Sequence, residues 1–530
     1  SLSSIGNGTG AGGDVLVSIE NAQGTDFADT LSGSAVDNFL IGRGGGDKLF
    51  GRAGNDQLQG GGGADWLDGG EGSDWAMYDD SETRVTINLL TNVHALGAAG
   101  DKLFSIENVQ GSAFNDSITG NTVDNLLLGG AGDDGLFGGL GNDQLRGGLG
   151  KDTLDGGAGN SDWALYRDGA TQGITLFLAD NTANARGAFG DRLFNIENVQ
   201  GTEFADLIHG NAAANVLAGN GGDDVLYGEG GGDNLSGGLG GDQIHGGGGD
   251  DVLFGGAGND HLFDEEAANA ADSDTFLPGA GADTVTGDGN DTVEYSDAAA
   301  GVAVDLTQTG AGQTGGAPDG DTLTGILGIA GSGFNDTLIS SLTGNGADIA
   351  VLRGFAGSDS ITLNHNFDQA FGGDDADTIV LKAASQTANG GDGNDVLVAS
   401  LATAARLIGG AGSDTLTGNA TAIDQFVIEK VSGVDTITNF LQSGQSGAGR
   451  DLLVLSLSGF GLGATFEAGE LVSSGTGAAV GAAAQLIYNE TTHELWFDAD
   501  GTTAVEAAMK LALLQNAPAH LTLADFGVLA

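Results

Sequence analysis

Several residue types are absent or scarce in this chain of 530 residues. It has no cysteine, which excludes disulfides and thiolate metal sites. Lys and Arg together number 16 against 73 Asp and Glu, so the formal net charge is −57. Phosphate recognition needs a basic surface, so this charge argues against nucleic acid and against anionic membranes as partners. The charge instead favours a protein that binds cations.

Long hydrophobic runs and proline are also scarce. No apolar run approaches the roughly 18 residues of a membrane span, so the sequence predicts no such span. Proline occurs only 3 times, whereas glycine occurs 101 times. Hydrophobic residues still make up 40% of the chain. That share is enough for a core, so the acidity does not indicate disorder.

Glycine and aspartate recur in a nine-residue pattern. From Gly24 the first block reads GTDFADTLS, GSAVDNFLI, GRGGGDKLF, GRAGNDQLQ, GGGGADWLD and GGEGSDWAM. Further blocks begin at Gly111 and Gly201, and the three together hold nineteen such nonapeptides. From 331 to 424 the glycine-rich words start 18 or 19 residues apart. We interpret that stretch as a roll with a regular turn on one side and a divergent turn on the other.

A longer period is superimposed on the nonapeptides. One segment occurs at 13–33, 100–120 and 190–210, with starts 87 and 90 residues apart, and a looser fourth copy begins at Gly320. Alternating stretches precede the three later copies, at 84–90, 173–179 and 301–307, and predict strands with one buried face. The first copy lacks this stretch. We therefore expect residue 1 to fall inside a repeat unit and the natural protein to extend upstream.

Each nonapeptide combines a tight turn with a short strand. In GGAGNDHLF (255–263) glycine fills slots one, two and four, where it permits positive φ and close approach of carbonyls. Aspartate at slot six adds a carboxylate. A donor set of carbonyl and carboxylate oxygens suits Ca²⁺. The lack of Cys and the presence of only 7 His argue against zinc, copper and nickel.

One turn cannot surround an ion, but the next turn on the same side can complete the shell if strands stack roughly 4.8 Å apart. Two nonapeptides then make one circuit. The slot-eight residues would face inward from two sheets: Leu49, Leu58, Leu67, Leu145, Leu154, Leu235, Ile244, Leu253 and Leu262.

These nonapeptides resemble the repeats-in-toxin (RTX, hemolysin-type) family, whose repeat is G-G-x-G-x-D-x-U-x. The likeness is close over 24–77, 111–164 and 201–263 and looser over 279–294 and 331–424. It implies an all-β fold of tandem right-handed parallel β-rolls, with calcium between successive turns, β-rich spacers between rolls and a β-rich C-terminal cap.

The resemblance also implies the calcium ligands, of which Asp162 has slipped to slot seven. The predicted metal-binding residues are Asp47, Asp56, Asp65, Asp74, Asp134, Asp143, Asp152, Asp162, Asp224, Asp233, Asp242, Asp251, Asp260, Asp283, Asp291, Asp359, Asp377, Asp395 and Asp414.

The second nonapeptide of each block departs from the family pattern. Asn38, Asn125 and Asn215 replace the slot-six aspartate, and the glycines at slots two and four are missing. A neutral amide ligates calcium less well than a carboxylate does. We expect these turns to be free of calcium or closed by the Asn side chain, with loading beginning one nonapeptide later. The first-word residues Asp29, Asp116 and Asp206 are therefore left outside the predicted set.

The repeats predict nine segments. These are a truncated spacer (1–23), roll block 1 (24–77), a spacer (78–110), roll block 2 (111–164), a spacer (165–200), roll block 3 with a divergent end (201–294), a spacer (295–330), divergent roll block 4 (331–423) and a C-terminal cap with a secretion-signal region (424–530).

Aromatic residues and the tail add smaller expectations. The aromatic residues of DWAMY (Trp75 and Tyr78) and of DWALY (Trp163 and Tyr166) are expected to cap the open end of each roll. In the tail, Leu486–Tyr488 should pair with Leu495–Phe497 as a hairpin. The stretch 504–514 has helix propensity, but the alternation of Met509, Leu511 and Leu513 favours a strand. No G-x-S-x-G, Walker A or HExxH motif occurs, so we expect the chain itself not to be an enzyme.

The resemblance further implies export from a Gram-negative bacterium by the type I secretion machinery, with an uncleaved signal near 521–530, and an extracellular, calcium-rich location. Candidate partners besides calcium are further copies of the chain or a cell-surface polysaccharide. Two functions fit. The first is a structural module of a surface layer, matrix or adhesin. The alternative is the calcium-binding carrier tail of a secreted protease, lipase, polysaccharide epimerase or toxin whose catalytic domain lies upstream.

Overall fold

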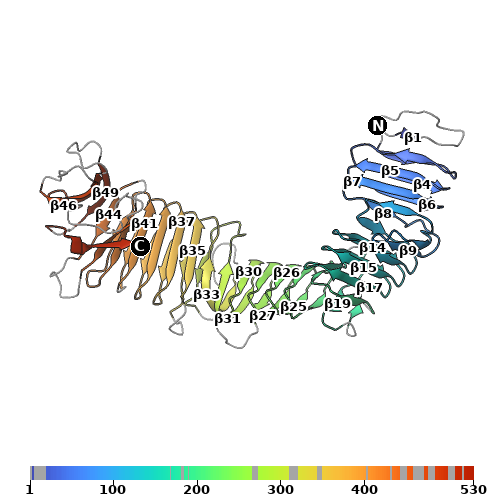
Figure 1. Cartoon of the computed structure of the whole chain (residues 1–530). Helices are drawn as coiled ribbons and strands as arrows, with labels where there is room; N and C mark the ends of the chain where they lie inside the picture. The colour runs from blue at the N-terminus through green and yellow to red at the C-terminus, as the bar shows by residue number, and fades with distance from the viewer. Residues whose placement is uncertain are drawn as a thin grey trace. The chain divides into compact units, whose positions relative to one another are not determined.

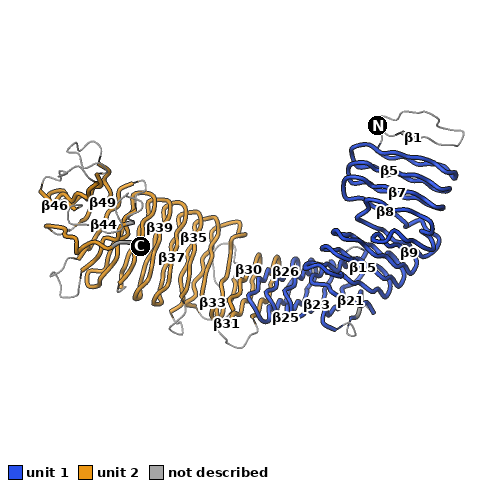
Figure 2. Tube along the Cα trace, in the orientation of Figure 1, with its two compact units in different colours: residues 1–254 blue, residues 255–530 orange. Residues whose placement is uncertain are grey.

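The computed structural model describes residues 3–4, 20–167, 169–180, 184–188, 190–264, 272–308, 320–342, 349–401, 404–429, 433–441, 450–456, 471–475, 484–498, 508–515 and 519–529. The chain divides into two compact units, Ser1–Phe254 and Gly255–Ala530, and each is described by itself (Figure 2).

The regular structure is almost entirely β. Among the described residues the one helical element is the short 3-10 helix η2 (Leu523–Asp525), and everything else regular is a strand (Figure 1). Glycines with positive φ, such as Gly61 at +86° and Gly63 at +152°, lie where the chain turns between short strands. The predicted all-β roll of parallel strands is confirmed.

One sheet of unit 1 runs through all of its blocks, with every neighbouring pair parallel. Its strands, in pairing order, are β2 (Asn21–Gln23), β4 (Phe39–Gly44), β6 (Gln57–Gly62), β8 (Trp75–Met77), β12 (Asn108–Gln110), β14 (Leu126–Ala131), β16 (Gln144–Leu149), β18 (Trp163–Leu165), β22 (Asn198–Gln200), β24 (Val216–Gly221) and β26 (Asn234–Leu239). We call it the continuous sheet.

The intervening strands form the facing side of unit 1, which is interrupted at each spacer. Its first segment holds β3 (Thr30–Ser32), β5 (Lys48–Ala53), β7 (Trp66–Glu71) and β11 (Lys102–Phe104), with β1 (Ser3–Ser4) antiparallel to β3. The second holds β9 (Val85–Asn88), β13 (Ser117–Thr119), β15 (Gly135–Leu140), β17 (Thr153–Ala158) and β21 (Arg192–Phe194), with β10 (Ala95–Leu96) antiparallel to β9. The third holds β19 (Ile174–Phe177), β23 (Leu207–Asn211), β25 (Val225–Gly230) and β27 (Gln243–Gly248), with β20 (Ala185–Arg186) antiparallel to β19.

The register confirms that two nonapeptides make one circuit. Leu40 lies opposite Leu58, and Leu49 lies opposite Leu67, each pair eighteen residues apart. All nine slot-eight residues named above are at most 1% exposed, so the predicted inward-facing aliphatic core is also confirmed. Because side chains alternate along a strand, the residues on either side point outward.

Strand β28 (Val252–Ala257) crosses the division between the units. Unit 2 continues with β29 (His261–Phe263), β30 (Thr275–Ala280) and β31 (Thr284–Glu294). Strands β29 and β30 each pair in parallel with β31, and β31 pairs in parallel with β33 (Thr322–Ala330). From β33 one side runs through β35 (Val351–Ala356), β37 (Gln369–Asp374), β39 (Thr387–Asp392), β41 (Arg406–Ala411), β43 (Gln425–Ile428), β45 (Leu452–Ser456) and β50 (Phe526–Leu529).

The other side of unit 2 has β32 (Ala303–Asp305), β34 (Thr337–Ile339), β36 (Ser360–Leu363), β38 (Thr378–Leu381), β40 (Val396–Ala399), β42 (Thr415–Thr417), β44 (Asp435–Thr438), β49 (Met509–Leu514), β48 (Glu494–Asp498), β47 (Gln485–Asn489) and β46 (Leu471–Ser474).

The tail contains the expected hairpin. Strands β47 and β48 pair antiparallel, with Leu486 opposite Phe497 and Tyr488 opposite Leu495. Residues 509–514 form a strand, as the alternation predicts. Met509 is 41% exposed, whereas Leu511, Ala512 and Leu514 are buried. The pairing of β48 with β49 shifts register between Leu495 and Trp496, and such a bulge disturbs strict alternation.

Candidate metal centre

The slot-six aspartates lie inside the turns, and their carboxylates form a ladder along each edge of the roll. Asp56 and Asp74 are fully buried. The Oδ1 atom of Asp56 accepts the N–H of Asn38, and that of Asp74 accepts the N–H of Asp56, both at 2.7 Å. The same bond recurs one circuit apart in the second block, where Asp152 Oδ1 accepts the N–H of Asp134 at 2.9 Å. This contact fixes each carboxylate against the neighbouring turn.

The second carboxylate oxygen is what distinguishes these turns. Among the described residues, Oδ2 is buried and has no hydrogen-bond partner in Asp47, Asp56, Asp65, Asp74, Asp134, Asp143, Asp152, Asp162, Asp224, Asp233, Asp283, Asp359, Asp377, Asp395 and Asp414. A buried anionic oxygen without a donor is costly in free energy. Its repetition at these fifteen aspartates is what a row of bound cations would satisfy.

Backbone carbonyls surround the same oxygens. A methyl group added to Gly42 would lie 2.6 Å from the carbonyl oxygen of Gly60, in the next turn, and closer still to Asp47 Oδ2. A methyl on Gly63 would meet the carbonyl oxygen of Gly45. Carboxylate and carbonyl oxygens therefore converge where any larger side chain would intrude. This all-oxygen donor set fits Ca²⁺.

The pKa values of the ladder carboxylates are raised, so a positive charge beside them would be stabilising. Burial raises the pKa of Asp65 and of Asp74 to about 6, of Asp152 to about 7 and of Asp224 to about 8. The backbone hydrogen bond to each carboxylate lowers the pKa, while neighbouring carboxylates raise it further. A bound cation would offset both desolvation and repulsion, because it favours the charged form.

Three further predicted residues of the third block occupy equivalent turns. Asp242, Asp251 and Asp260 are buried. The Oδ1 atoms of Asp242 and Asp251 accept the N–H groups of Asp224 and Asp233 at 2.8 and 2.7 Å. The N–H of Asp260 donates to Asp283 Oδ1 at 2.8 Å.

The first two turns of each block are closed by protein groups. Oδ2 of Asp29, Asp116 and Asp206 accepts the N–H of Thr25, Ser112 and Thr202, the slot-two residues. In the following turns Oδ1 of Asn38, Asn125 and Asn215 accepts the N–H of Ser34, Asn121 and Asn211 at 2.6–2.8 Å. The expected closure by the Asn side chain is therefore present. That these turns stay free of calcium remains a prediction.

The structure adds ladder members that sequence reasoning missed. Oδ1 of Asp101, Asp191 and Asp321 accepts the N–H of Asp65, Asp152 and Asp283, each at 2.9 Å. Their Oδ2 atoms accept the hydroxyls of Tyr78, Tyr166 and Tyr295 at 2.9–3.0 Å. Tyr78 and Tyr166 thus close a turn at a spacer, rather than capping a free roll end, since the continuous sheet passes on. The signal was the Gly-Asp pair that opens each copy of the 21-residue segment.

The two edges of block 4 differ, with regular turns on one edge and divergent turns on the other, as its glycine pattern predicts. Asp359, Asp377, Asp395 and Asp414 carry the unpartnered Oδ2 atoms on the regular edge. On the divergent edge, Oδ2 of Asp368 accepts the Ser340 hydroxyl at 2.8 Å. Further along this edge, Oδ2 of Asp424 and Asp451 accepts the N–H groups of Asn419 and Leu441 at 2.6 and 2.7 Å.

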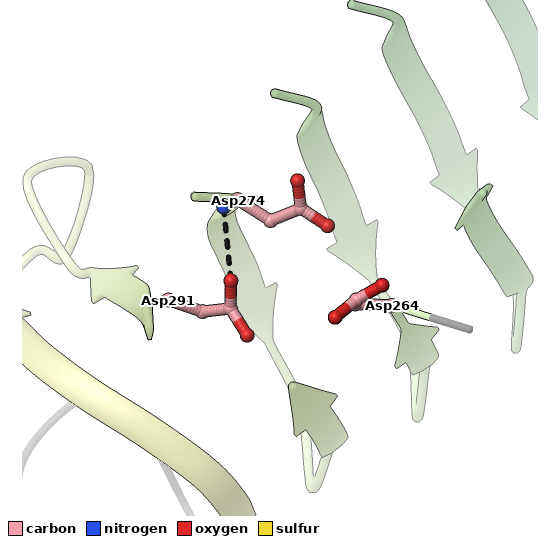
Figure 3. A group of neighbouring side chains, drawn as sticks. All are labelled: Asp264, Asp274 and Asp291. Atoms are coloured by element: carbon pink, nitrogen blue, oxygen red, sulfur yellow. Dashed lines mark hydrogen bonds between the residues drawn. The ribbon is translucent and has the colours of Figure 1, made fainter. Parts of the chain in front are cut away.

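Figure 3 shows a separate acidic group at the divergent end of block 3. Asp264, Asp274 and Asp291 each place a carboxylate oxygen within 4.8 Å of the others. The N–H of Asp274 donates to Asp291 Oδ1 at 2.9 Å, and Asp291 Oδ2 accepts the N–H of Asp288 at 2.8 Å. Of the three, the sequence predicted Asp291. Asp264 and Asp274 escaped it because 264–274 lacks the nonapeptide glycines.

A buried carboxylate ladder on glycine turns defines a calcium-binding β-roll. The family model described as "RTX calcium-binding nonapeptide repeat (4 copies)" matches residues 23–58, 41–76, 110–145, 128–161, 200–235, 227–262 and 404–422. The chain therefore carries RTX calcium-binding nonapeptide repeats, which bind several Ca²⁺ ions and indicate a secreted, extracellular protein. No curated protein matches the chain. In the described part of the chain, no helix is both long and apolar enough to cross a membrane.

Proposed function

We propose that this chain is a calcium-rigidified structural module of an extracellular surface, such as a surface layer, a matrix or an adhesin. The observation that carries the proposal is the continuous sheet of unit 1. At the first spacer β12 pairs with β8 on one side and β14 on the other, and at the second β22 pairs with β18 and β24. The spacers therefore join rolls by in-register backbone pairing, which suits a protein that must resist bending.

Calcium supplies the switch between flexible and rigid states. Without cations, a net charge of −57 and the buried carboxylates oppose folding. Sites in extracellular modules commonly have dissociation constants on the order of 10⁻⁴–10⁻³ M, so calcium would load them outside the cell. Binding energy then becomes folding energy. Such a chain can pass a type I secretion channel unfolded and become rigid on arrival.

The rival function is the calcium-binding tail of a secreted enzyme or toxin. It shares the calcium-driven folding but needs no assembly. The RTX repeats are structural and calcium-binding rather than catalytic, so any reaction would belong to another part of a longer protein. A cell-surface polysaccharide or further copies of the chain are the partners that the structural function would use.

The test is a calcium titration of the purified chain, followed in parallel by circular dichroism, light scattering and negative-stain electron microscopy. The structural proposal predicts a coil-to-β transition together with ordered assemblies, alone or on added cell-surface polysaccharide. The same transition in a chain that stays monomeric and binds no cell surface would overturn the proposal in favour of the carrier tail.

A further inference from the structure

We propose that the spacers supply two calcium sites outside the nonapeptide pattern, with Glu107 and Glu197 as their additional ligands. Each would close the calcium row of one edge, at the last turn of blocks 1 and 2. The proposal rests on the calcium binding of the RTX repeats and extends it to residues that match no nonapeptide.

Glu107 takes the place of the next slot-six aspartate in the ladder. Its Oε2 atom accepts the N–H of Asp74 at 3.0 Å, as Asp74 Oδ1 accepts the N–H of Asp56. In the second block Glu197 Oε2 accepts the N–H of Asp162 at 2.9 Å. The backbone follows the same course, since the N–H of Asn108 donates to the carbonyl of Asp74 as that of Trp75 donates to Asp56.

A spacer carbonyl also replaces the glycine carbonyl of the next turn. In the interior of block 1, a methyl on Gly51 would lie 2.6 Å from the carbonyl oxygen of Gly69. At the last turn, a methyl on Gly69 would meet the carbonyl oxygen of Ser105 and Asp74 Oδ2. Ser105 has φ of +47°, an uncommon value for a residue with a side chain. This left-handed conformation directs the chain as a glycine turn does.

The second block repeats the arrangement with different residues. A methyl on Gly156 would meet the carbonyl oxygen of Asn195 and lie 2.6 Å from Asp162 Oδ2. Asn195 has φ of +49°. In a nonapeptide the carbonyl of slot one and the carboxylate of slot six are five residues apart, whereas Ser105 and Glu107 are two apart. The additional methylene of glutamate extends its reach, so a shorter loop can place a carboxylate at the same point.

The aspartates beside these two glutamates each have a carboxylate oxygen that a cation could contact. Asp74 and Asp162 are both fully buried, and in the described residues their Oδ2 atoms have no hydrogen-bond partner. Repulsion between the carboxylates contributes to the raised pKa of Asp74 and of Glu197, after the larger effect of burial. Two buried or half-buried carboxylates and a carbonyl thus converge at each turn.

The fourth copy of the segment provides a natural comparison. Its residues 325–328 read GILG where the second and third copies read SIEN and NIEN, so Leu327 stands in the place of Glu107. The aspartate that corresponds to Asp74 there is Asp291, because Thr292 pairs with Gly328 as Trp75 pairs with Asn108. Asp291 Oδ2 already accepts the N–H of Asp288 at 2.8 Å. Where the glutamate is missing, a protein donor therefore meets the oxygen instead.

The test counts bound Ca²⁺ by native mass spectrometry on the full chain, for the wild type and for the variant E107Q/E197Q. Glutamine keeps an oxygen that can accept the N–H of Asp74 or Asp162, so the ladder bond survives while the charge is lost. We expect the variant to bind two fewer ions than the wild type. The control E71Q/E203Q removes the same charge from two exposed side chains and should bind the full number.

Circular dichroism in saturating calcium checks that each variant folds. If the double variant does not fold, the single variants E107Q and E197Q decide, and each should lose one ion. An unchanged count in folded E107Q/E197Q, or an equal loss in E71Q/E203Q, would overturn the proposal. Absence of calcium binding in the wild type would instead overturn the calcium assignment itself.

Discussion

The hydroxyl of Tyr78 donates a hydrogen bond of 2.9 Å to Asp101 Oδ2, on the oxygen that corresponds to the unpartnered one in the regular turns. Tyr78 is 3% exposed and Asp101 is 2% exposed. The Tyr78 hydroxyl therefore satisfies an oxygen that a cation would satisfy in a regular turn. Tyr166 with Asp191 and Tyr295 with Asp321 repeat the pair.

Replacing Tyr78 with phenylalanine should destabilise the calcium-loaded protein. The substitution leaves Asp101 Oδ2 buried without its donor, which costs about 1–3 kcal/mol. Urea unfolding in saturating calcium measures the loss. Tyr227→Phe is the control, because Tyr227 lies on the outer side of β25, stacked between His209 and His245. Equal stability of the two variants would show that the Tyr78 hydroxyl contributes nothing.

Replacing Asp56 with asparagine should raise the calcium concentration at the folding midpoint. Asparagine can still accept the N–H of Asn38, but it removes the charge that a cation needs. The midpoint is read from circular dichroism during a calcium titration. Asp79→Asn makes the same chemical change at an exposed side chain of the adjoining spacer and should leave the midpoint in place. If both variants shift it equally, net charge rather than the Asp56 site controls folding.

Truncating a core leucine should destabilise the roll even when calcium is bound. Leu58 is fully buried between Leu40 and its other neighbours in the continuous sheet. Leu58→Ala should cost about 2–5 kcal/mol through lost burial and the cavity left behind. Leu149→Ala is the matched control, since Leu149 is 70% exposed. The measurement is thermal unfolding in saturating calcium. A Leu58→Ala variant that melts at the wild-type temperature would contradict the prediction.

The calcium-free and calcium-loaded chains should respond to pH in opposite directions. Burial raises the pKa of Asp65 to about 6, of Asp152 to about 7 and of Asp224 to about 8, from an ordinary value of 3.8. Protonation therefore stabilises the calcium-free fold fully below pH 3.8, and this stabilisation is lost as the pH rises through 6 to 8. Calcium needs the deprotonated carboxylates, so its apparent affinity should fall as the pH drops through the same window.

The measurement is circular dichroism in excess chelator between pH 4 and 8, together with calcium titrations at each end. We expect β structure in chelator to be greatest near pH 4 and the calcium midpoint to be lowest near pH 8. A calcium midpoint independent of pH would mean that these carboxylates do not bind the ion.

The sequence predicted those features that repeat with the nonapeptide. Slot eight fixed the buried leucines, because a strand of alternating side chains has one inward face. Slot six placed the aspartates in the turns, and the absence of glycine at slots two and four beside Asn38 predicted a turn closed by its side chain. Each of these features depends on residues within one nonapeptide, so the nine-residue repeat alone predicts them.

The features that the sequence did not predict depend on contacts between distant residues. Asp101 meets Tyr78 across 23 residues, and Glu107 meets Asp74 across 33 residues, through spacers that share no period with the rolls. The bulge of β49 opposite Trp496 was not predicted, because it depends on the pairing of β49 with β48. The group of Asp264 and Asp274 lies in a stretch without the glycines that identify a turn.

The eighteen-residue circuit has a consequence for how such a chain can change length. One nonapeptide covers half a circuit, so removing a single word would transfer every later turn to the opposite edge. The tyrosine closure after Asp65 and the glutamate after Asp74 would then face the wrong rows. Whole circuits, by contrast, can be inserted or deleted without disturbing either end. Blocks 1 and 2 hold six words each, an even number that preserves this parity.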